Sequence, residues 1–361
     1  MASNPVIIFG AGATKACGGP LTNEILYDFF RHEHELEREG FLDLLNMFLV
    51  DSFYVPRDLS QRTKEHYPGL PLLLSLLDVS IDKKQPMGKN WGTEKLVHVR
   101  DALEYGIFAL LERELRRLTD NHYYDLFGIL MDRSIEPQVI SLNYDIIADN
   151  SMIRLCEDRA FEPGLPDYGC EIATDFYRDR PKFGTLLKIH GSLNWLYCPG
   201  CHRLDLGVSE ASSQTIKVLI DAYQENPLEP RYGCHGSPCL ECGTYVRPVL
   251  ITPTQSKDYR NPHISQIWYQ AERLLRNADR VIIIGYCLPE DDVDVIYMLK
   301  RGLEELSKKS PEIITVVEFD DQKRDIYTHP TGLRYRTLFG EHIDWRTEGF
   351  KGWIESTTSI V

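Results

Sequence analysis

The sequence lacks any run of about 18 consecutive apolar residues, so we expect no helix that crosses a membrane. It begins MASNPVIIFG, which enters a strand-like run at once and lacks the charged and apolar regions of a signal peptide. It also lacks internal repeats and low-complexity segments. These absences predict a cytoplasmic protein that does not associate with a membrane.

Basic residues are scarce as well. Lys and Arg together number 40 against 54 Asp and Glu, which gives a net charge of −14. General nucleic-acid binders usually carry a basic face, because much of their affinity comes from contacts with phosphates. We therefore expect no direct binding of nucleic acid.

Cysteine is too sparse for a disulfide scaffold, with nine in 361 residues. Four of them form two CxxC pairs, which favours metal binding in a reducing compartment. A thioredoxin-type redox motif is the weaker alternative, because such a motif stands alone at the start of a helix. We predict a structural zinc site, with His202, Cys234 and His235 as candidates to replace one ligand. The predicted ligands are Cys198, Cys201, Cys239 and Cys242.

Short apolar runs rich in β-branched residues recur along the chain, each followed by a turn and then a helical pattern. Runs that are apolar throughout are typical of strands buried on both faces, as in a parallel sheet covered by helices. Buried helix segments are the weaker alternative, because each run is short and ends near Gly, Asp, Asn or Pro. The runs are residues 5–10, 136–145, 185–191, 247–254, 279–286 and 312–320.

Two segments interrupt this alternation. One, at about 22–130, is mostly helical in pattern, with apolar residues at helical spacing over 93–118 and a predicted loop over 81–92. The other holds the CxxC pairs. We therefore predict an α/β fold with a Rossmann-like parallel sheet, an inserted helical module and a zinc-ribbon module. The predicted division is 1–21, 131–195 and 247–345 for the Rossmann-like domain, 22–130 for the helical module, 196–246 for the zinc ribbon and 346–361 for a C-terminal tail.

The first apolar run leads into a glycine loop, VIIFGAGAT at 6–14. Glycines let backbone N–H groups approach a phosphate, and the next helix presents its positive end to it. The third glycine of the dehydrogenase pattern GxGxxG would fall at Lys15, so that fingerprint fails. We favour a phosphate-binding loop of another type, with backbone contacts from Gly10, Ala11 and Gly12 and a hydroxyl from Thr14. A purely structural turn is the alternative.

Polar side chains follow two further runs. VISLNYDII places Asn143 and Asp145 at the carboxyl end of an apolar strand, where open α/β sheets bind ligands. The same residues could equally cap the following helix. His190 ends the run TLLKIHG, and a base at this edge of the sheet favours a catalytic site over a packed core histidine.

The order of these motifs resembles the sirtuins, and more closely the bacterial sirtuin-like branch found in antiphage defence systems. The motifs are GAGAT, NYD, HGS, the two CxxC pairs and a late strand ending in IGY. SLNYD, KIHGSLNW, LITPTQSKDY and IIIGYCLPEDD are similar to that branch in particular. The resemblance covers most of the chain and is weakest from about 30 to 130. It implies an NAD-binding Rossmann-like domain into which a helical module and a zinc ribbon are inserted.

The resemblance also implies roles for individual residues. Asn143 would place a water or substrate at the nicotinamide ribose, Asp145 would hold the carboxamide, and His190 would polarise the ribose hydroxyls. Glu318 would bind the ribose of the adenosine half, and Asp320 is the alternative for that role. The residues implied to bind NAD+ are Gly10, Ala11, Gly12, Thr14, Gly191, Ser192, Gly285 and Glu318.

The sequence departs from protein-deacylating sirtuins in two places. The Gly-Ile-Pro-Asp-Phe-Arg-like segment that usually follows GAGAT is replaced by CGGPLTNE at 17–24. The Phe-Gly-Glu stretch that pairs with the acyl-lysine peptide is replaced by VLITPTQSKDY at 249–259. We therefore expect hydrolysis of NAD+ itself. A deacylase or ADP-ribosyltransferase is one alternative, and a nucleotide sensor without catalysis is another.

An ungated hydrolase of NAD+ would kill its host, so we expect its activity to be controlled. The resemblance implies an antiphage effector that depletes NAD+ when activated. It also implies a homo-oligomer, a partner protein such as a HerA-type ATPase, or both. The helical module at 22–130 is the expected assembly surface.

Overall fold

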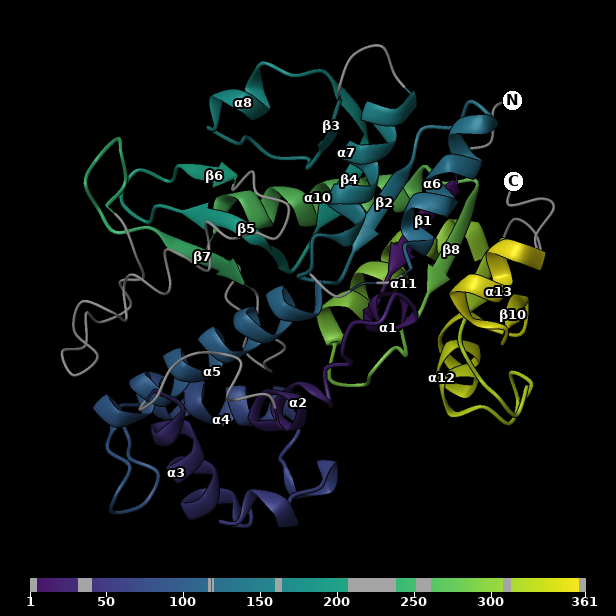
Figure 1. Ribbon diagram of the computed structural model, residues 1–361. Coiled ribbons are helices and arrows are strands. Elements are labelled where there is room, and N and C mark those ends of the chain that lie inside the picture. The colour runs from purple at the N-terminus through teal and green to yellow at the C-terminus, as the bar shows by residue number, and fades with distance from the viewer. Residues whose placement is uncertain are drawn as a thin grey trace.

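The computed structural model describes residues 5–31, 41–115, 118, 120–159, 164–206, 238–250, 261–307 and 313–356. Its centre is a seven-stranded sheet in the order β10-β9-β8-β1-β2-β4-β3, and its pairings are all parallel (Figure 1). The strands are β1 (Pro5–Phe9), β2 (Gln138–Ser141), β3 (Leu165–Asp167), β4 (Lys182–Lys188), β8 (Arg280–Ile284), β9 (Ile314–Val317) and β10 (Ile343–Arg346).

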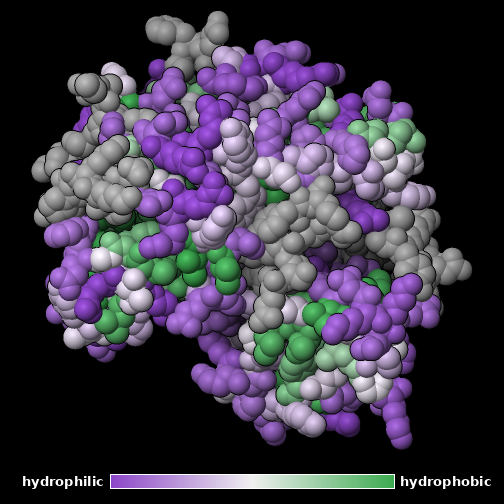
Figure 2. Space-filling view, turned by 180° about the vertical axis from the view of Figure 1, so that it is seen from behind, coloured by the Kyte–Doolittle hydropathy of each residue, from purple (hydrophilic) through white to green (hydrophobic). Residues whose placement is uncertain are grey.

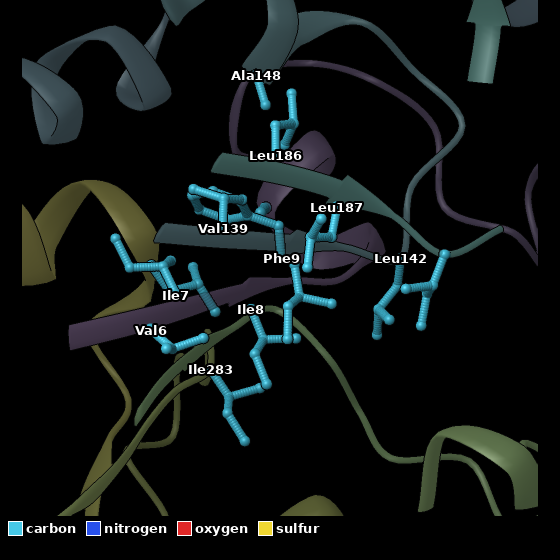
Figure 3. Packing of buried hydrophobic residues seen from close by; sticks show 14 of the residues in the cluster. Val6, Ile7, Ile8, Phe9, Val139, Leu142, Ala148, Leu186, Leu187 and Ile283 are labelled. Carbon is cyan, nitrogen blue, oxygen red and sulfur yellow. The ribbon is translucent and has the colours of Figure 1, made fainter. Parts of the chain in front are cut away.

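Helices cover both faces of this sheet, as strands that are apolar on both sides require. All residues of β1 and β9 are buried, and side chains such as Ile8, Val139 and Leu187 interlock across the central strands (Figure 3). The predicted parallel α/β fold is therefore confirmed. The helices around the sheet are α1 (Ala11–Ala16), α6 (His122–Asp132), α7 (Ile147–Arg159), α8 (Asp175–Arg178), α10 (Pro262–Arg276), α11 (Val293–Ser307), α12 (Pro330–Phe339) and α13 (Gly349–Ser356).

A second apolar core lies outside the sheet, within the predicted helical module. It is surrounded by α2 (Ile25–Arg31), α3 (Phe41–Phe53), α4 (Leu70–Asp82) and α5 (Thr93–Leu115). Two short 3-10 helices, η2 (Leu59–Gln61) and η3 (Lys64–His66), lie between α3 and α4 in the chain. The helical pattern is thus confirmed for these four helices. α6 also begins within 22–130, but it packs against β1 in the core of the sheet.

None of the helices in the described ranges is long and apolar enough to span a bilayer. The face seen from behind is largely hydrophilic, and its apolar residues gather in separate patches (Figure 2).

A smaller antiparallel sheet has the order β6-β5-β7 and leads into the cysteine pairs. It contains β5 (Gly191–Tyr197), β6 (Leu204–Leu206) and β7 (Arg247–Leu250). The sequence-based placement of 247–254 in the parallel sheet is wrong, because β7 pairs with β5 instead. An apolar run does not specify which sheet it joins. Pro248, which has no N–H to donate, is consistent with an edge strand.

The prediction of a C-terminal tail at 346–361 is also wrong for the described residues 346–356. α13 buries Phe350 and Trp353 in the main core. The ring of Phe350 lies 5.7 Å from that of Phe9 and 5.4 Å from that of Tyr123, between centroids. Large aromatic side chains bury much apolar surface, and this helix docks for that reason.

The direction of sheet growth reverses between β1 and β8, at the switch point where open α/β sheets bind ligands. Two glycine turns pack against each other here. The N–H of Gly10 donates to Ile284 O at 3.0 Å, and that of Gly12 donates to Gly285 O at 2.7 Å. Gly285 has φ +65°, and a Cβ there would lie 2.3 Å from the backbone nitrogen of Ala13. The glycines are therefore required by the packing of the two turns.

We predict that Gly285→Ala lowers the free energy of unfolding more than Gly340→Ala does. Gly340 also has a positive φ, +85°, but a Cβ there would meet nothing within 4 Å. Both variants should lose about 1–3 kcal/mol to a backbone conformation with positive φ, and only Gly285→Ala adds a clash with backbone. Urea unfolding of the two variants measures the difference. Equal losses would contradict the close packing described here.

Candidate active site

A cavity of about 520 Å³ lies at the carboxyl edge of the main sheet. This is within the range of roughly 300–1,000 Å³ that is usual for small-ligand pockets. One wall consists of strand ends and the turns that follow them. The opposite wall is apolar and comes from the helical module. It is formed by Ile25, Leu70, Pro71, Ile107 and Leu111.

Most of the predicted site residues line this cavity, although they come from five different strand ends. Gly10, Gly191 and Ser192 are not among the described lining residues. Ser192 is fully buried at the start of β5, where its hydroxyl donates to Asn194 Oδ1 at 2.7 Å. The predicted residues that line the cavity are Ala11, Gly12, Thr14, Asn143, Asp145, His190, Gly285 and Glu318.

Thr14 joins the glycine turn to the two polar residues that follow β2. Its hydroxyl donates to Asp145 Oδ2 at 2.5 Å and accepts from Asn143 Nδ2 at 3.0 Å. Asn143 Nδ2 also donates to the carbonyl of Gly10 at 2.9 Å. The side chain of Thr14 therefore fixes the relative positions of the amide and the carboxyl group.

These contacts determine which way the amide of Asn143 faces. The carbonyl of Gly10 can only accept, so the amide must turn its NH₂ group toward it. That orientation leaves Oδ1 of Asn143 as the acceptor for a ligand or a water.

The carboxyl group of Asp145 has two hydrogen-bond partners among the described residues. Besides Thr14, it accepts from the backbone N–H of Ile147 at 3.0 Å, at the start of α7. The capping alternative is therefore correct for Asp145, alongside its place in the cavity. Burial raises the pKa of this carboxyl group, and the nearby charge of Lys188 opposes that effect.

His190 is held by the loop that follows β2. Its Nδ1 lies 3.1 Å from the carbonyl of Leu142, and its ring sits between those of Tyr144 and Trp268. Because a carbonyl can only accept, this contact selects the tautomer with the proton on Nδ1. In the neutral ring, Nε2 is then the atom that can accept a proton.

The sequence reading missed a buried ion pair directly behind the cavity. Lys188 Nζ lies 2.9 Å from Asp149 Oδ2, and both side chains are 1% exposed. Lys188 also donates to the backbone carbonyl of Asp145, and Tyr168 donates its hydroxyl to Asp149 Oδ1 at 2.7 Å. A lysine inside an apolar strand was the available signal, because lysine is almost never fully buried unless it is paired.

Carboxyl groups dominate the charge of the cavity. Asp145, Asp291, Asp292 and Glu318 line it, and the described lining residues include neither Lys nor Arg. Burial raises the pKa of Glu318. Such a lining favours positive charge on a bound group. Asp320, the alternative to Glu318, instead pairs with Arg324 at 2.8 Å and is not a described lining residue.

The four predicted cysteine ligands come together beyond β5 and β7. Their Sγ atoms all lie within 4.8 Å of one another, with 3.4 Å from Cys198 to Cys242 and 3.7 Å from Cys201 to Cys239. Tetrahedral zinc with Zn–S bonds of about 2.3 Å requires S–S distances of about 3.8 Å. The residues therefore fit structural zinc, and a four-cysteine cluster argues against an isolated redox pair.

The two knuckles share a backbone conformation. The residue after the second cysteine of each pair is left-handed, with φ +62° at His202 and +74° at Gly243. His202 directs Nδ1 to the hydroxyl of Tyr197 at 2.5 Å and is outside the sulfur cluster. The other spare candidates, Cys234 and His235, lie outside the described residues.

We predict that the double variant Cys198→Ser, Cys242→Ser loses the bound zinc, because it removes one thiolate from each knuckle. Elemental analysis of the purified protein measures the metal content. Cys170→Ser is the matched control, since Cys170 is outside the cluster, and it should keep the zinc. Unchanged zinc content in the double variant would contradict the four-cysteine site.

No family model and no curated protein matches this sequence. Solved structures of Sir2 proteins do match it. A Sir2 homologue–NAD complex is 13% identical over 98% of this chain and 87% of that chain, with a TM-score of 0.44. Sir2Tm bound to a propionylated peptide is 10% identical over 97% and 89%, with a TM-score of 0.41. Sir2 proteins are the sirtuins, the family that the motif order of this chain resembles.

Proposed function

We propose that this protein is a sirtuin-like NAD+ hydrolase, which releases nicotinamide and ADP-ribose. The observation that carries the proposal is the convergence of Asn143, Asp145 and His190 on one cavity. They come from two neighbouring strand ends and are 8%, 5% and 7% exposed. A purely structural role does not require three different polar groups to face one buried space.

The charge of the cavity suits the bond that would break. In NAD+ the nicotinamide ring is a pyridinium cation, and as its bond to ribose C1′ breaks, the electron pair goes to the ring nitrogen. Positive charge then develops on the ribose as an oxocarbenium-like state. Water forms the new bond to C1′ and loses one proton, which gives nicotinamide, ADP-ribose and H⁺. Carboxyl groups already in place stabilise such developing charge.

Each of the three residues has a role that its hydrogen bonds support. Oδ1 of Asn143 accepts from the attacking water or a ribose hydroxyl, because its NH₂ group is held by Gly10 and Thr14. Asp145 binds the carboxamide through its remaining lone pairs. Nε2 of His190 accepts from a ribose hydroxyl. The apolar wall opposite them limits the access of other water.

Two features support water rather than an acyl group as the acceptor. Pro20, Leu21, Thr22 and Asn23 line the cavity where deacylases carry the Arg-containing segment. None of the described residues of β5–β7 is among those that line it. The replaced segment spans 249–259, and its residues after 250 lie outside the described part of the chain.

We also propose, from the motif resemblance, that the hydrolase is an antiphage effector whose activity is gated. A homo-oligomer or a partner such as a HerA-type ATPase would supply the gate. The helical module is suited to that role because α2, α4 and α5 provide the apolar wall of the cavity. A contact that moves this wall would alter the site directly.

We predict that Asn143→Ala and His190→Ala each reduce NAD+ cleavage by about 10²-fold or more. Release of nicotinamide measures it, with the protein alone and with the products of neighbouring genes. Asn90→Ala and His342→Ala remove the same groups from exposed positions and should leave the rate unchanged. Near-normal turnover in folded Asn143 and His190 variants would eliminate this site. NAD+ loss that requires an acetylated peptide would indicate a deacylase.

A further inference from the structure

The buried pair Lys188–Asp149 is an unusual feature at the end of an apolar strand. Lys188 is the last residue of β4 and pairs in register with Ser141 of β2. Its Nζ reaches across to the loop after β2, where it donates to the backbone carbonyl of Asp145. Asp149 lies on α7, and the chain of contacts continues to Tyr168 beyond β3.

Stability alone does not account for this pair. Removing two charges from water carries a large desolvation cost, and a well-packed apolar pair of similar volume is often at least as stable. The chain on either side of Lys188 is apolar, and Leu186, Leu187 and Ile189 are all buried. An explanation must therefore lie in what the ammonium group holds in place.

The ammonium group of Lys188 holds the peptide that carries the carboxyl group of the site. From that peptide the side chain of Asp145 reaches Thr14, and Thr14 in turn contacts Asn143. His190 follows Lys188 by two residues on the same chain segment. One short stretch thus supplies the imidazole and also anchors the loop that supplies the amide and the carboxyl group.

We propose that Lys188 is a positioning residue, which together with Asp149 and Tyr168 fixes the loop after β2 so that Asp145 faces the cavity. This inference rests on the proposed cleavage of NAD+. Lys188 is fully buried and does not line the cavity, so it acts on a ligand only through Asp145.

The electrostatic surroundings of Asp145 give the proposal a second consequence. Burial raises the pKa of Asp145, the charge of Lys188 opposes this, and Asp149 adds to the increase. Burial also raises the pKa of Cys17, to about 11, and that of Tyr123, so both are neutral at pH 7. Removing Lys188 should therefore raise the pKa of Asp145 further. If activity needs the ionised carboxylate, the acid limb of the pH–activity profile would then lie at a higher pH.

The test uses the double variant Lys188→Met, Asp149→Leu, because removing one partner alone leaves a buried charge uncompensated. We expect a folded protein whose kcat for NAD+ cleavage falls by about 10- to 100-fold. We also expect the acid limb of its pH profile to move to higher pH, because the charge of Lys188 affects the pKa of Asp145 more than the charge of Asp149 does. The matched control is Arg100→Met, Asp78→Leu, Glu104→Gln, which removes the charges of a partly buried cluster in the helical module with N–O distances of 2.9 and 3.2 Å. That control should change neither kcat nor the acid limb.

Combining the pair variant with Asp145→Asn tests whether Lys188 affects kcat through Asp145. If Lys188 acts through Asp145, adding the pair variant to Asp145→Asn should lower kcat little further, since contributions that share one route are not additive. A full additional decrease would overturn the proposal, and so would a normal kcat and pH profile in the folded pair variant. If the pair variant does not fold, Tyr168→Phe removes one hydroxyl and no charge. It should lower kcat and leave the acid limb in place, because Lys188 keeps its charge, and a wild-type kcat there would also overturn the proposal.

Failure of the proposed function can be told apart from failure of this inference. If the wild-type chain binds NAD+ without cleaving it, the hydrolase proposal fails and the same variants are compared by calorimetric titration with NAD+. The pair variant and Asp145→Asn should then weaken binding to a similar degree. Wild-type affinity in the pair variant, with weakened binding in Asp145→Asn, would overturn the positioning role. Absence of NAD+ binding by the wild-type chain would overturn both.

Discussion

The contact between two glycine turns, at Gly12 and Gly285, determines where this protein can build a site. Backbone approaches backbone there so closely that a single added carbon would clash. The approach brings the end of β1 against the end of β8, on either side of the point where sheet growth reverses. It also sets the start of α1, and so places Thr14 where its hydroxyl meets Asp145 and Asn143. Loss of the contact would separate the polar groups without altering any of them.

Three sets of contacts then hold Asn143, Asp145 and His190 in the cavity. Thr14 ties the glycine turn to the loop after β2. The carbonyl of Leu142 in that loop orients the imidazole of His190. Behind both, Lys188 and Asp149 hold the loop from within the core. Asn143, Asp145 and His190 are thus each fixed by a neighbouring group, and such support is needed if charge is to be stabilised without reorganisation.

The sequence predicts the parts of this fold that depend on local pattern. Runs that are apolar on both faces identified five strands of the parallel sheet, and the paired cysteines identified the sulfur cluster. Pairing partners are not local, and for that reason β7 was assigned to the wrong sheet. The docking of α13 depends on a space left open by Phe9 and Tyr123, which the sequence does not display.

The residues of the candidate site likewise fall into those that the sequence predicts and those that it does not. Asn143, Asp145 and His190 were recognisable because they follow apolar runs at the ligand edge of a sheet. The apolar wall was not, because the residues of α2, α4 and α5 look like ordinary core residues until the two units are packed together.

The closeness of His190 to the first cysteine pair in the sequence follows from the path of the chain. β4 ends at Lys188 inside the parallel sheet, and β5 begins at Gly191 in the antiparallel one. The left-handed backbone of Gly191 is possible only because it lacks a Cβ, which would lie 2.1 Å from Val249 O. The chain turns there from one sheet to the other, so His190 stays in the cavity while Cys198 lies in the sulfur cluster. Since the described residues of β5–β7 are absent from the cavity lining, a closed metal site would support the turn from outside and take no direct part in the chemistry.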